Sequence, residues 1–201
     1  ARVAPRLLVQ IGLLAGVVGV VVLLTAIGPQ MSGGAFATAM TILGAGLGLA
    51  FSQLGNVNLS SADTTRSSEV GGLQGTAQNL GSSLGTALAG SVLFIGLIAT
   101  FNYNLANQPN VDQALTQQVA AATATGVPVV PASEVESTVL AAGATQSQAD
   151  AIVTSYEDGK LQSLRAALLI VAGVGVIGLL LTRRLPSKPL TDDAPEGATA
   201  T

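Results

Sequence analysis

Residues 69–101 read EVGGLQGTAQNLGSSLGTALAGSVLFIGLIATF, and this stretch has no charged residue after Glu69. A transmembrane helix needs about 20 mostly apolar residues, so the stretch is long enough to cross a bilayer. Its first two thirds are rich in Gly, Ser, Thr, Gln and Asn in place of Leu and Val. Such small and polar residues are typical of helices that pack closely against other membrane helices. The stretch therefore predicts a membrane helix among other helices, beside a solute pathway.

The composition of the whole chain is that of an integral membrane protein. Of its 201 residues, 49% are hydrophobic and only 9% are charged, whereas a soluble domain carries about 25% charged residues. The mean hydropathy is +0.59, and the chain contains 24 glycines, which are commoner in membrane helices than in soluble ones. The expected fold class is all-α integral membrane.

Several classes of function are excluded by what the chain lacks. It has no Cys and no His, which excludes disulfides, a thiol nucleophile, an imidazole base and Cys/His metal sites. It has no basic stripe and few aromatic residues, so no nucleic-acid partner is expected. The glycine-rich run from Gly44 to Gly48 lacks the spacing of a dinucleotide-binding loop. No metal and no cofactor are expected.

Four segments are apolar enough to span a membrane. The first three fill residues 1–101, a long segment of different composition follows, and the last span precedes a polar tail. The tail, residues 185–201, has almost no large apolar residues and is expected to be disordered. The predicted spans are residues 7–27, 35–55, 70–101 and 164–184, with the long segment at 102–163.

Short helices are expected in the long segment, which is rich in Ala, Thr, Gln and Val. Apolar residues recur at helical spacing over 111–119. The run Ser133–Glu136 resembles a capping box that opens a helix through Leu140, which ends near Gly143. Residues 149–156 predict a further short helix.

The basic residues predict the topology, because cytoplasmic flanks of membrane helices are enriched in Lys and Arg. If the spans alternate in direction, six of the eight basic residues fall on one side. Residues 102–163 carry six acidic residues against Lys160 and should be external. Arg165, at the outer edge of the last span, can extend to the interface. Both termini are then cytoplasmic. The six basic residues are Arg2, Arg6, Arg66, Arg183, Arg184 and Lys188.

Two faces of the third span collect small and polar residues when it is drawn as a helix, and the remaining side carries Leu and Ile. Close packing against other helices is the simpler interpretation of these faces, and a water-filled cavity beside the amides is the functional one. The residues expected to line a cavity are Gln74, Gln78, Asn79 and Thr86. The residues expected to pack against helices are Gly71, Gly75, Gly81, Gly85 and Gly90, with Gly44 and Gly48 of the second span. The first span has a similar packing face at Gly12, Gly16 and Gly19.

The charged residues around the third span have two possible roles. Asp63, Arg66 and Glu69 lie at its predicted cytoplasmic end, either as an ordinary solvated loop or as a salt-bridged inner gate. Beyond Glu69, no Asp or Glu lies in any predicted span. Buried carboxylates are the usual carriers of proton coupling, so a coupling acid is not expected in these four helices.

The region from residue 44 to residue 90 resembles the major facilitator superfamily of transporters, and within it the fourteen-helix drug:proton antiporter branch. A Gly-rich span, a short charged loop and a helix that opens S-x-x-x-G-x-x-x-T-x-x-x-x-G-x-x-x-G carry the resemblance. Here that helix opens SEVGGLQGTAQNLGSSLG, from Ser68 to Gly85. The branch also has a long external loop before its last helix. Some of its exporters place an acid within the penultimate helix, which this chain does not.

The resemblance implies the last four helices of a carboxy-terminal bundle. The implied function is the C-terminal part of a secondary-active exporter in the plasma (inner) membrane, which moves small amphipathic compounds against proton entry and makes or breaks no bond. Its partners are then the bilayer, the remaining N-terminal helices, the substrate and protons. The chain begins at Ala1 and is expected to be a piece of a longer protein or to be processed. The main alternative is a self-contained four-helix membrane protein for binding or assembly, and a pore is a weaker one.

Overall fold

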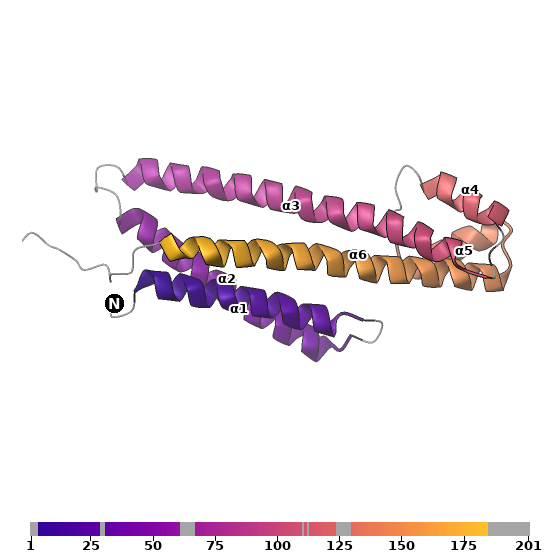
Figure 1. Cartoon of the computed structure of the whole chain (residues 1–201), viewed down its shortest axis with the longest axis horizontal. Helices are drawn as coiled ribbons and strands as arrows, with labels where there is room; N and C mark the ends of the chain where they lie inside the picture. Colours follow the sequence, from indigo (N-terminus) through magenta and orange to yellow (C-terminus); the bar gives the residue numbers. More distant parts are fainter. Residues whose placement is uncertain are drawn as a thin grey trace, which may run out of the picture. The chain divides into compact units, whose positions relative to one another are not determined.

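The structure, a computed structural model, describes residues 4–28, 31–60, 67–109, 111, 113–123 and 130–184, and helices joined by short turns form nearly all of this part of the chain. Figure 1 labels the elements in chain order. The α-helices are α1 (Pro5–Ala26), α2 (Gly33–Ser60), α3 (Ser67–Ala106), α4 (Gln113–Thr123), α5 (Ala132–Ala141) and α6 (Gln146–Leu181), and η2 (Thr182–Arg184) follows α6.

Four of these helices, α1, α2, α3 and α6, are long and apolar enough to cross a membrane. This confirms that the chain forms four apolar helices of spanning length. Three of them are clearly longer than predicted, and α2 continues past Gly55 to Ser60. The helix α3 continues past Phe101 to Ala106, and α6 begins at Gln146 instead of near Leu164. No proline interrupts α6, so nothing in its sequence stops the helix between its polar start and its apolar end.

The chain forms two compact units, and both α3 and α6 contribute to each of them. The first unit comprises residues 1–26, 31–82 and 172–201, and the second comprises residues 27–30 and 83–171. The division follows composition, because the apolar hairpin α1–α2 belongs to the first unit and the more polar helices α4 and α5 belong to the second.

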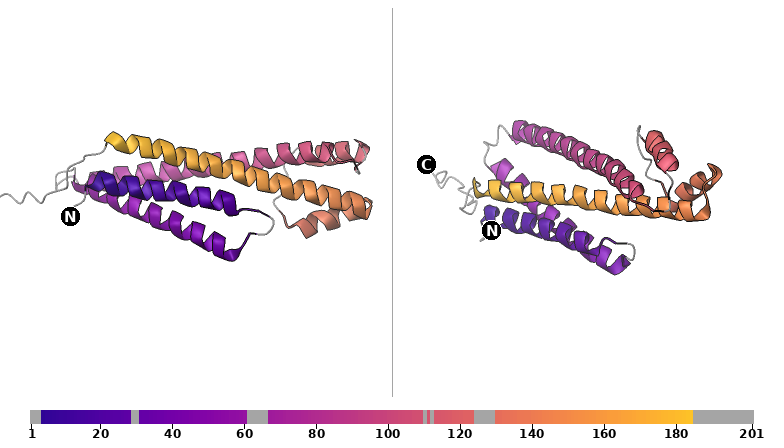
Figure 2. Two further views of the ribbon diagram at one scale, coloured as in Figure 1. Left: turned by 60° about the horizontal axis from the view of Figure 1, so that its bottom comes forward. Right: turned by 45° about the vertical axis from the view of Figure 1, so that its right-hand side comes forward.

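Glycines bring α1 and α2 of the first unit into close contact (Figure 2). A Cβ atom added at Gly12 would lie 2.7 Å from the backbone nitrogen of Ala50 and from the carbonyl oxygen of Gly46. One added at Gly19 would lie 2.7 Å from the backbone nitrogen of Leu43. Small residues allow such backbone approach between helices, so the packing face predicted for α1 is confirmed at Gly12 and Gly19.

The second unit has its own small apolar core, where the end of α3 meets the start of α6. Phe101 of α3 and Tyr156 of α6 are buried there with ring centroids 6.1 Å apart, edge to face at 83°. This is a favourable geometry for two aromatic rings. Leu97, Leu105 and Ile152 complete the buried cluster, and partly buried valines of α4 and α5 pack against it. Residues 102–163, expected as an external segment with short helices, therefore contribute to a packed core.

Two local expectations for this unit are corrected. The helix α5 starts at Ala132 after the N-cap Pro131 and has no side-chain cap, so the predicted capping box at Ser133 is wrong. Residues 149–156, expected as a separate helix, are the beginning of α6. The predicted end of α5 is confirmed. Gly143 takes the left-handed φ of +94°, which glycine adopts without strain, and its N–H donates to the Leu140 carbonyl at 3.0 Å.

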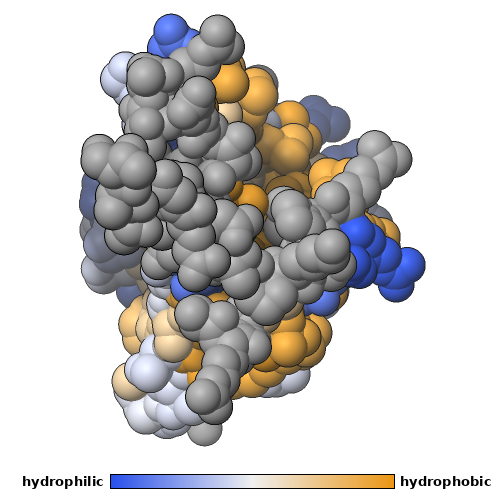
Figure 3. All heavy atoms as spheres, turned by 90° about the vertical axis from the view of Figure 1, so that its left-hand side faces the viewer, coloured by the Kyte–Doolittle hydropathy of each residue, from blue (hydrophilic) through white to orange (hydrophobic). Residues whose placement is uncertain are grey.

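Large apolar side chains stand exposed on the four long helices, and Figure 3 shows such side chains in orange at the surface of the face that it draws. Exposed apolar patches of this kind mark a surface that something other than water covers. On α3 they follow the side where the sequence places Leu and Ile. On α3 and α6 the exposed residues include Leu73, Leu80, Leu84, Leu88 and Ile95 of α3 and Leu169, Ile177, Leu180 and Leu181 of α6.

Candidate functional site

A hollow of about 610 Å³ lies beside the polar part of α3, in the first unit. Phe51 of α2 and four residues of α3 line it, and all five are exposed, so the hollow is an open groove. We call it the amide groove after two of its α3 residues, Gln78 and Asn79. Its other α3 residues are Gly81 and Ser82. Its volume lies in the range of about 300–1,000 Å³ that is usual for small-molecule sites.

The groove offers neutral hydrogen-bonding groups beside one aromatic ring. The side-chain amides of Gln78 and Asn79 each present a carbonyl acceptor and an NH₂ donor. Among the residues that the structure describes, neither amide has a hydrogen-bond partner and no charged side chain lines the groove. The face of Phe51 can stack on a flat apolar group or attract a cation. This combination suits an amphipathic molecule with a polar or cationic end.

Gln74 and Thr86, also predicted to line a cavity, do not line the amide groove. Gln74 is half-buried against α2, and a Cβ atom added at Gly55 would lie 3.8 Å from its Nε2. Thr86 is exposed and belongs to the second unit. The structure therefore brings Gln78 and Asn79 together and leaves the other two apart from them, and no result yet tests a transport role for any of the four.

The predicted packing glycines share one property. A Cβ atom added at any of them would meet nothing within 4 Å. In the α1–α2 contact the close glycine of α2 is Gly46, where an added Cβ atom would lie 2.5 Å from the backbone nitrogen of Gly16. Packing against further helices therefore stays a prediction for the whole set, which is Gly44, Gly48, Gly71, Gly75, Gly81, Gly85 and Gly90.

The predicted cytoplasmic gate falls mostly on residues that the structure does not describe. Asp63 and Arg66 lie outside the described residues. Glu69 is exposed in the first turn of α3. A carboxylate there is stabilised by the partial positive charge of the helix N-terminus, which gives Glu69 a local structural role. A gate at this place stays a prediction.

Arg165 makes a contact that the sequence did not indicate. Its Nη2 donates a hydrogen bond of 2.7 Å to the carbonyl oxygen of Ile27, directly after the end of α1. A cation at a helix C-terminus pairs with the carbonyl groups left without intrahelical donors. Arg165 was expected only to extend toward an interface, and no sequence pattern names a backbone carbonyl as its partner.

Metal binding has no support in the part of the chain that the structure describes, since no three Asp or Glu residues gather there. All buried side-chain nitrogen and oxygen atoms of those residues are hydrogen-bonded. In the amide groove, polar groups and an aromatic ring meet beside long apolar helices. Comparison with known proteins adds nothing to this assignment, because no protein-family model, curated protein or solved structure matches the chain.

Proposed function

We propose that this chain is the C-terminal part of a secondary-active membrane transporter, an exporter of small amphipathic compounds driven by proton entry. One observation carries the proposal. The amide groove places Phe51, Gln78 and Asn79 together beside helices that are otherwise long and apolar. Unpaired amides on a membrane helix are costly unless they meet a partner, and a transported solute is such a partner.

The resemblance to the fourteen-helix drug:proton antiporters supports the same function. In such transporters the substrate site lies near the bilayer midplane between two helical bundles, which rock about it to open alternately to each side. The groove would then be one wall of that site. The open surface of α3 supports this placement, because Leu73 and residues 76–88 are exposed on every side of the helix. Further helices of the transporter would cover the small-residue faces.

Proton coupling is assigned to the other helices of the transporter. No Asp or Glu occurs in α3 after Glu69, and the acidic residues of α6 all lie in its first half, from Asp150 to Asp158. A proton carrier in the membrane needs a buried group that titrates, and an amide does not. In this proposal α3 supplies contacts to the substrate and the remaining bundle supplies the charge that moves.

The test is export by the complete transporter in liposomes under an imposed pH gradient, with a fluorescent cationic dye as substrate. Gln78→Ala and Asn79→Ala each remove hydrogen-bonding capacity from the groove, which costs about 1 kcal/mol per bond and lowers kcat/KM about fivefold. Leu84→Ala is the matched control, because Leu84 is 70% exposed on the same helix and does not line the groove. Wild-type export by both amide variants at normal expression would show that the groove is not a substrate site.

The glycine faces of α3 favour a second function, assembly. They are uncovered, and small residues in this spacing promote association between membrane helices. In a protein whose only role is assembly, Gly75→Leu and Gly85→Leu would abolish self-association seen by chemical cross-linking, and no dye would move. Dye export in the absence of cross-linked oligomers would favour the transporter function over assembly.

A further inference from the structure

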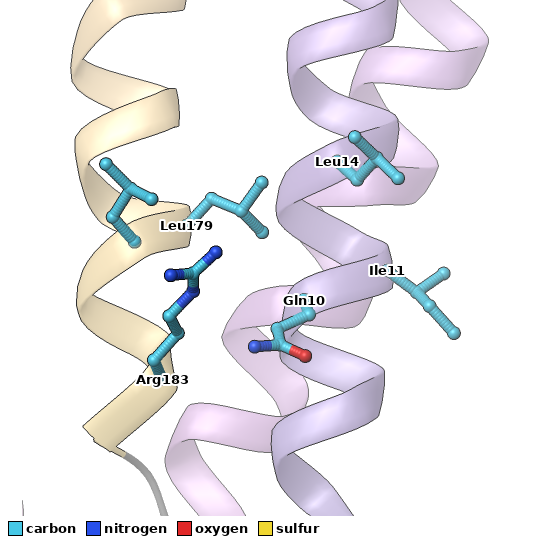
Figure 4. Close-up of a pocket in the computed structure, with 6 residues that line it drawn as sticks. Gln10, Ile11, Leu14, Leu179 and Arg183 are labelled. Atoms are coloured by element: carbon cyan, nitrogen blue, oxygen red, sulfur yellow. The ribbon is translucent and has the colours of Figure 1, made fainter.

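A second hollow, of about 280 Å³, lies between α1 and the end of α6, within the first unit. Ile11 and Leu14 of α1 form one wall and Leu179 and Leu180 of α6 form the other. Figure 4 shows Arg183 of η2 and Gln10 of α1 at one end of this hollow, with both side chains between the two helices. We call it the arginine groove. It has four apolar residues along its length and a cation at its end.

No carboxylate among the residues that the structure describes pairs with the cation of the arginine groove. Among the described residues Arg183 forms no ion pair or hydrogen bond through its side chain, and neither does Gln10. Glu69 is the one acidic residue that the described part of the first unit contains, and it does not line the groove. Such a guanidinium offers several N–H donors in a planar fork, which matches the oxygens of a phosphate group.

We propose that the arginine groove binds one anionic phospholipid, with the phosphate on Arg183 and Gln10 and an acyl chain along the apolar walls. Charge complementarity selects this occupant. None of the described residues that line the groove has a carboxylate to pair with the ammonium group of a zwitterionic lipid, and basic residues lie near its residues in the sequence at both ends of the chain. Basic pockets between membrane helices on the cytoplasmic side are known to hold anionic head groups. The inference rests on the membrane placement proposed above and is independent of transport.

Its test uses the absence of tryptophan from this chain, which makes a single introduced Trp the only indole reporter. Leu7→Trp places it on α1 one turn before Ile11, at an exposed position outside the groove. Leu84→Trp is the control reporter, because it is exposed on α3 far from any basic residue in the sequence. The chain is reconstituted in phosphatidylcholine vesicles that contain a minor fraction of brominated phosphatidylglycerol or, in a parallel set, brominated phosphatidylcholine.

Quenching at the Leu7→Trp reporter is expected to show a preference of about fivefold for phosphatidylglycerol over phosphatidylcholine, the value for one basic contact at a membrane surface. Arg183→Gln should remove the preference, and Arg183→Lys should keep most of it because the charge remains. Lys160→Gln, which removes an exposed charge from the other half of α6, should leave it unchanged. The Leu84→Trp reporter should be quenched equally by both lipids.

Two results would overturn the proposal, and they differ in what else they overturn. Equal quenching by both lipids at both reporters rejects the phospholipid site and leaves the membrane placement and the transport proposal standing. An absence of quenching at both reporters shows that the helices are not in the bilayer, which rejects the site together with the membrane placement. Loss of dye export with an unchanged lipid preference would reject only transport.

Discussion

The two tyrosines of this chain occupy opposite environments, which makes them a matched pair. Tyr156 is 1% exposed in the core of the second unit, whereas Tyr103 is 71% exposed. The Tyr156 hydroxyl accepts a hydrogen bond of 3.0 Å from the Val130 N–H and donates one of 3.1 Å to the Val130 carbonyl. One side chain thereby fixes the backbone of the segment that leads into α5.

Tyr156→Phe keeps the ring and removes both hydrogen bonds. We expect a loss of about 1 kcal/mol or more, because the Val130 backbone groups lose their partner, and a fall in Tm of about 2–4 °C per kcal/mol. Thermal unfolding in detergent, followed by circular dichroism, measures the change. Tyr103→Phe should leave Tm at the wild-type value. Equal effects of the two substitutions would mean that the hydroxyl of Tyr156 contributes nothing.

Gly46 and Gly48 of α2 differ sharply in the space beside them. A Cβ atom at Gly46 would lie 2.6 Å from the carbonyl oxygen of Gly12, whereas one at Gly48 would meet nothing within 4 Å. Gly46→Ala should force the α1–α2 hairpin apart at a cost of about 1–3 kcal/mol. Gly48→Ala should be neutral or slightly stabilising, because alanine favours the helix. Unfolding of both variants in a denaturing detergent checks this, and an unaffected Gly46→Ala variant would contradict the close contact.

These glycines also show what residue patterns can and cannot predict. The row Gly12, Gly16 and Gly19 follows helical spacing, so the packing face of α1 was readable from the sequence. In α2, glycines alternate at 44, 46 and 48 and therefore point in different directions around the helix. Which of these glycines faces α1 depends on the surface of α1, so the spacing in α2 alone does not predict it. The hydrogen bond from Arg165 to the Ile27 carbonyl was not predictable for the same reason, because only the tertiary fold brings these two residues together.

At the scale of the element, α3 is longer than a bilayer requires. Its 40 residues extend about 60 Å at about 1.5 Å per residue, twice the thickness of about 30 Å of a hydrocarbon core. The pattern of residues predicted this helix, and the end of the apolar run near Phe101 predicted where the helix ends. The chain instead stays helical to Ala106, because Leu105 is buried in the core of the second unit and packing extends the helix.

The length of α3 gives a labelling prediction. The chain has no cysteine, so an introduced cysteine is its only thiol. Both Tyr103 and Leu84 are exposed, but the polar end of α3 that carries Tyr103 should stand in water while Leu84 faces lipid. A membrane-impermeant maleimide should modify the Tyr103→Cys variant rapidly and the Leu84→Cys variant at least tenfold more slowly. Equal rates would show that α3 does not cross a bilayer at this place.

The helix α6 is also longer than its composition suggests. Its polar start and apolar end differ so much in composition that the sequence predicted two helices separated by a loop. The structure has one helix of 36 residues. Its polar half is helical because Ile152 and Tyr156 pack into the core of the second unit, so periodic burial of a few residues outweighs the change in mean hydropathy. A change in composition marks where a helix passes from a polar to an apolar environment, but it does not mark the end of the helix.

For the whole molecule, the distribution of charge predicts how the chain crosses the membrane. The basic residues of both ends should be cytoplasmic, and the acidic segment 102–163 should be external. In right-side-out vesicles, an impermeant maleimide should modify a cysteine at Thr154, which is exposed in α6, and should spare one at Ser187 until the vesicles are opened. Modification of the Ser187 variant alone would mean that the chain has the opposite orientation.

The amide groove was only half predictable on this scale. Gln78 and Asn79 were readable as unusual groups on an apolar helix, because their type alone marks them. Phe51 was not, since an aromatic residue on an apolar helix fits a lipid-facing place equally well. The arginine groove was hidden for a related reason, as its two apolar walls come from opposite ends of the chain.

The pair of hydrogen bonds between Tyr156 and Val130 has a further consequence, for aggregation. Val130 lies in a valine-rich run between Pro128 and Pro131, and neither proline has the N–H that pairing with a strand of another chain would need. Such pairing begins at backbone N–H and C=O groups that have no partner. At Val130 a single phenol occupies both groups, as a neighbouring strand would. Val130 therefore offers neither its N–H nor its C=O to a strand of another molecule, and the prolines on either side of it have no N–H to offer.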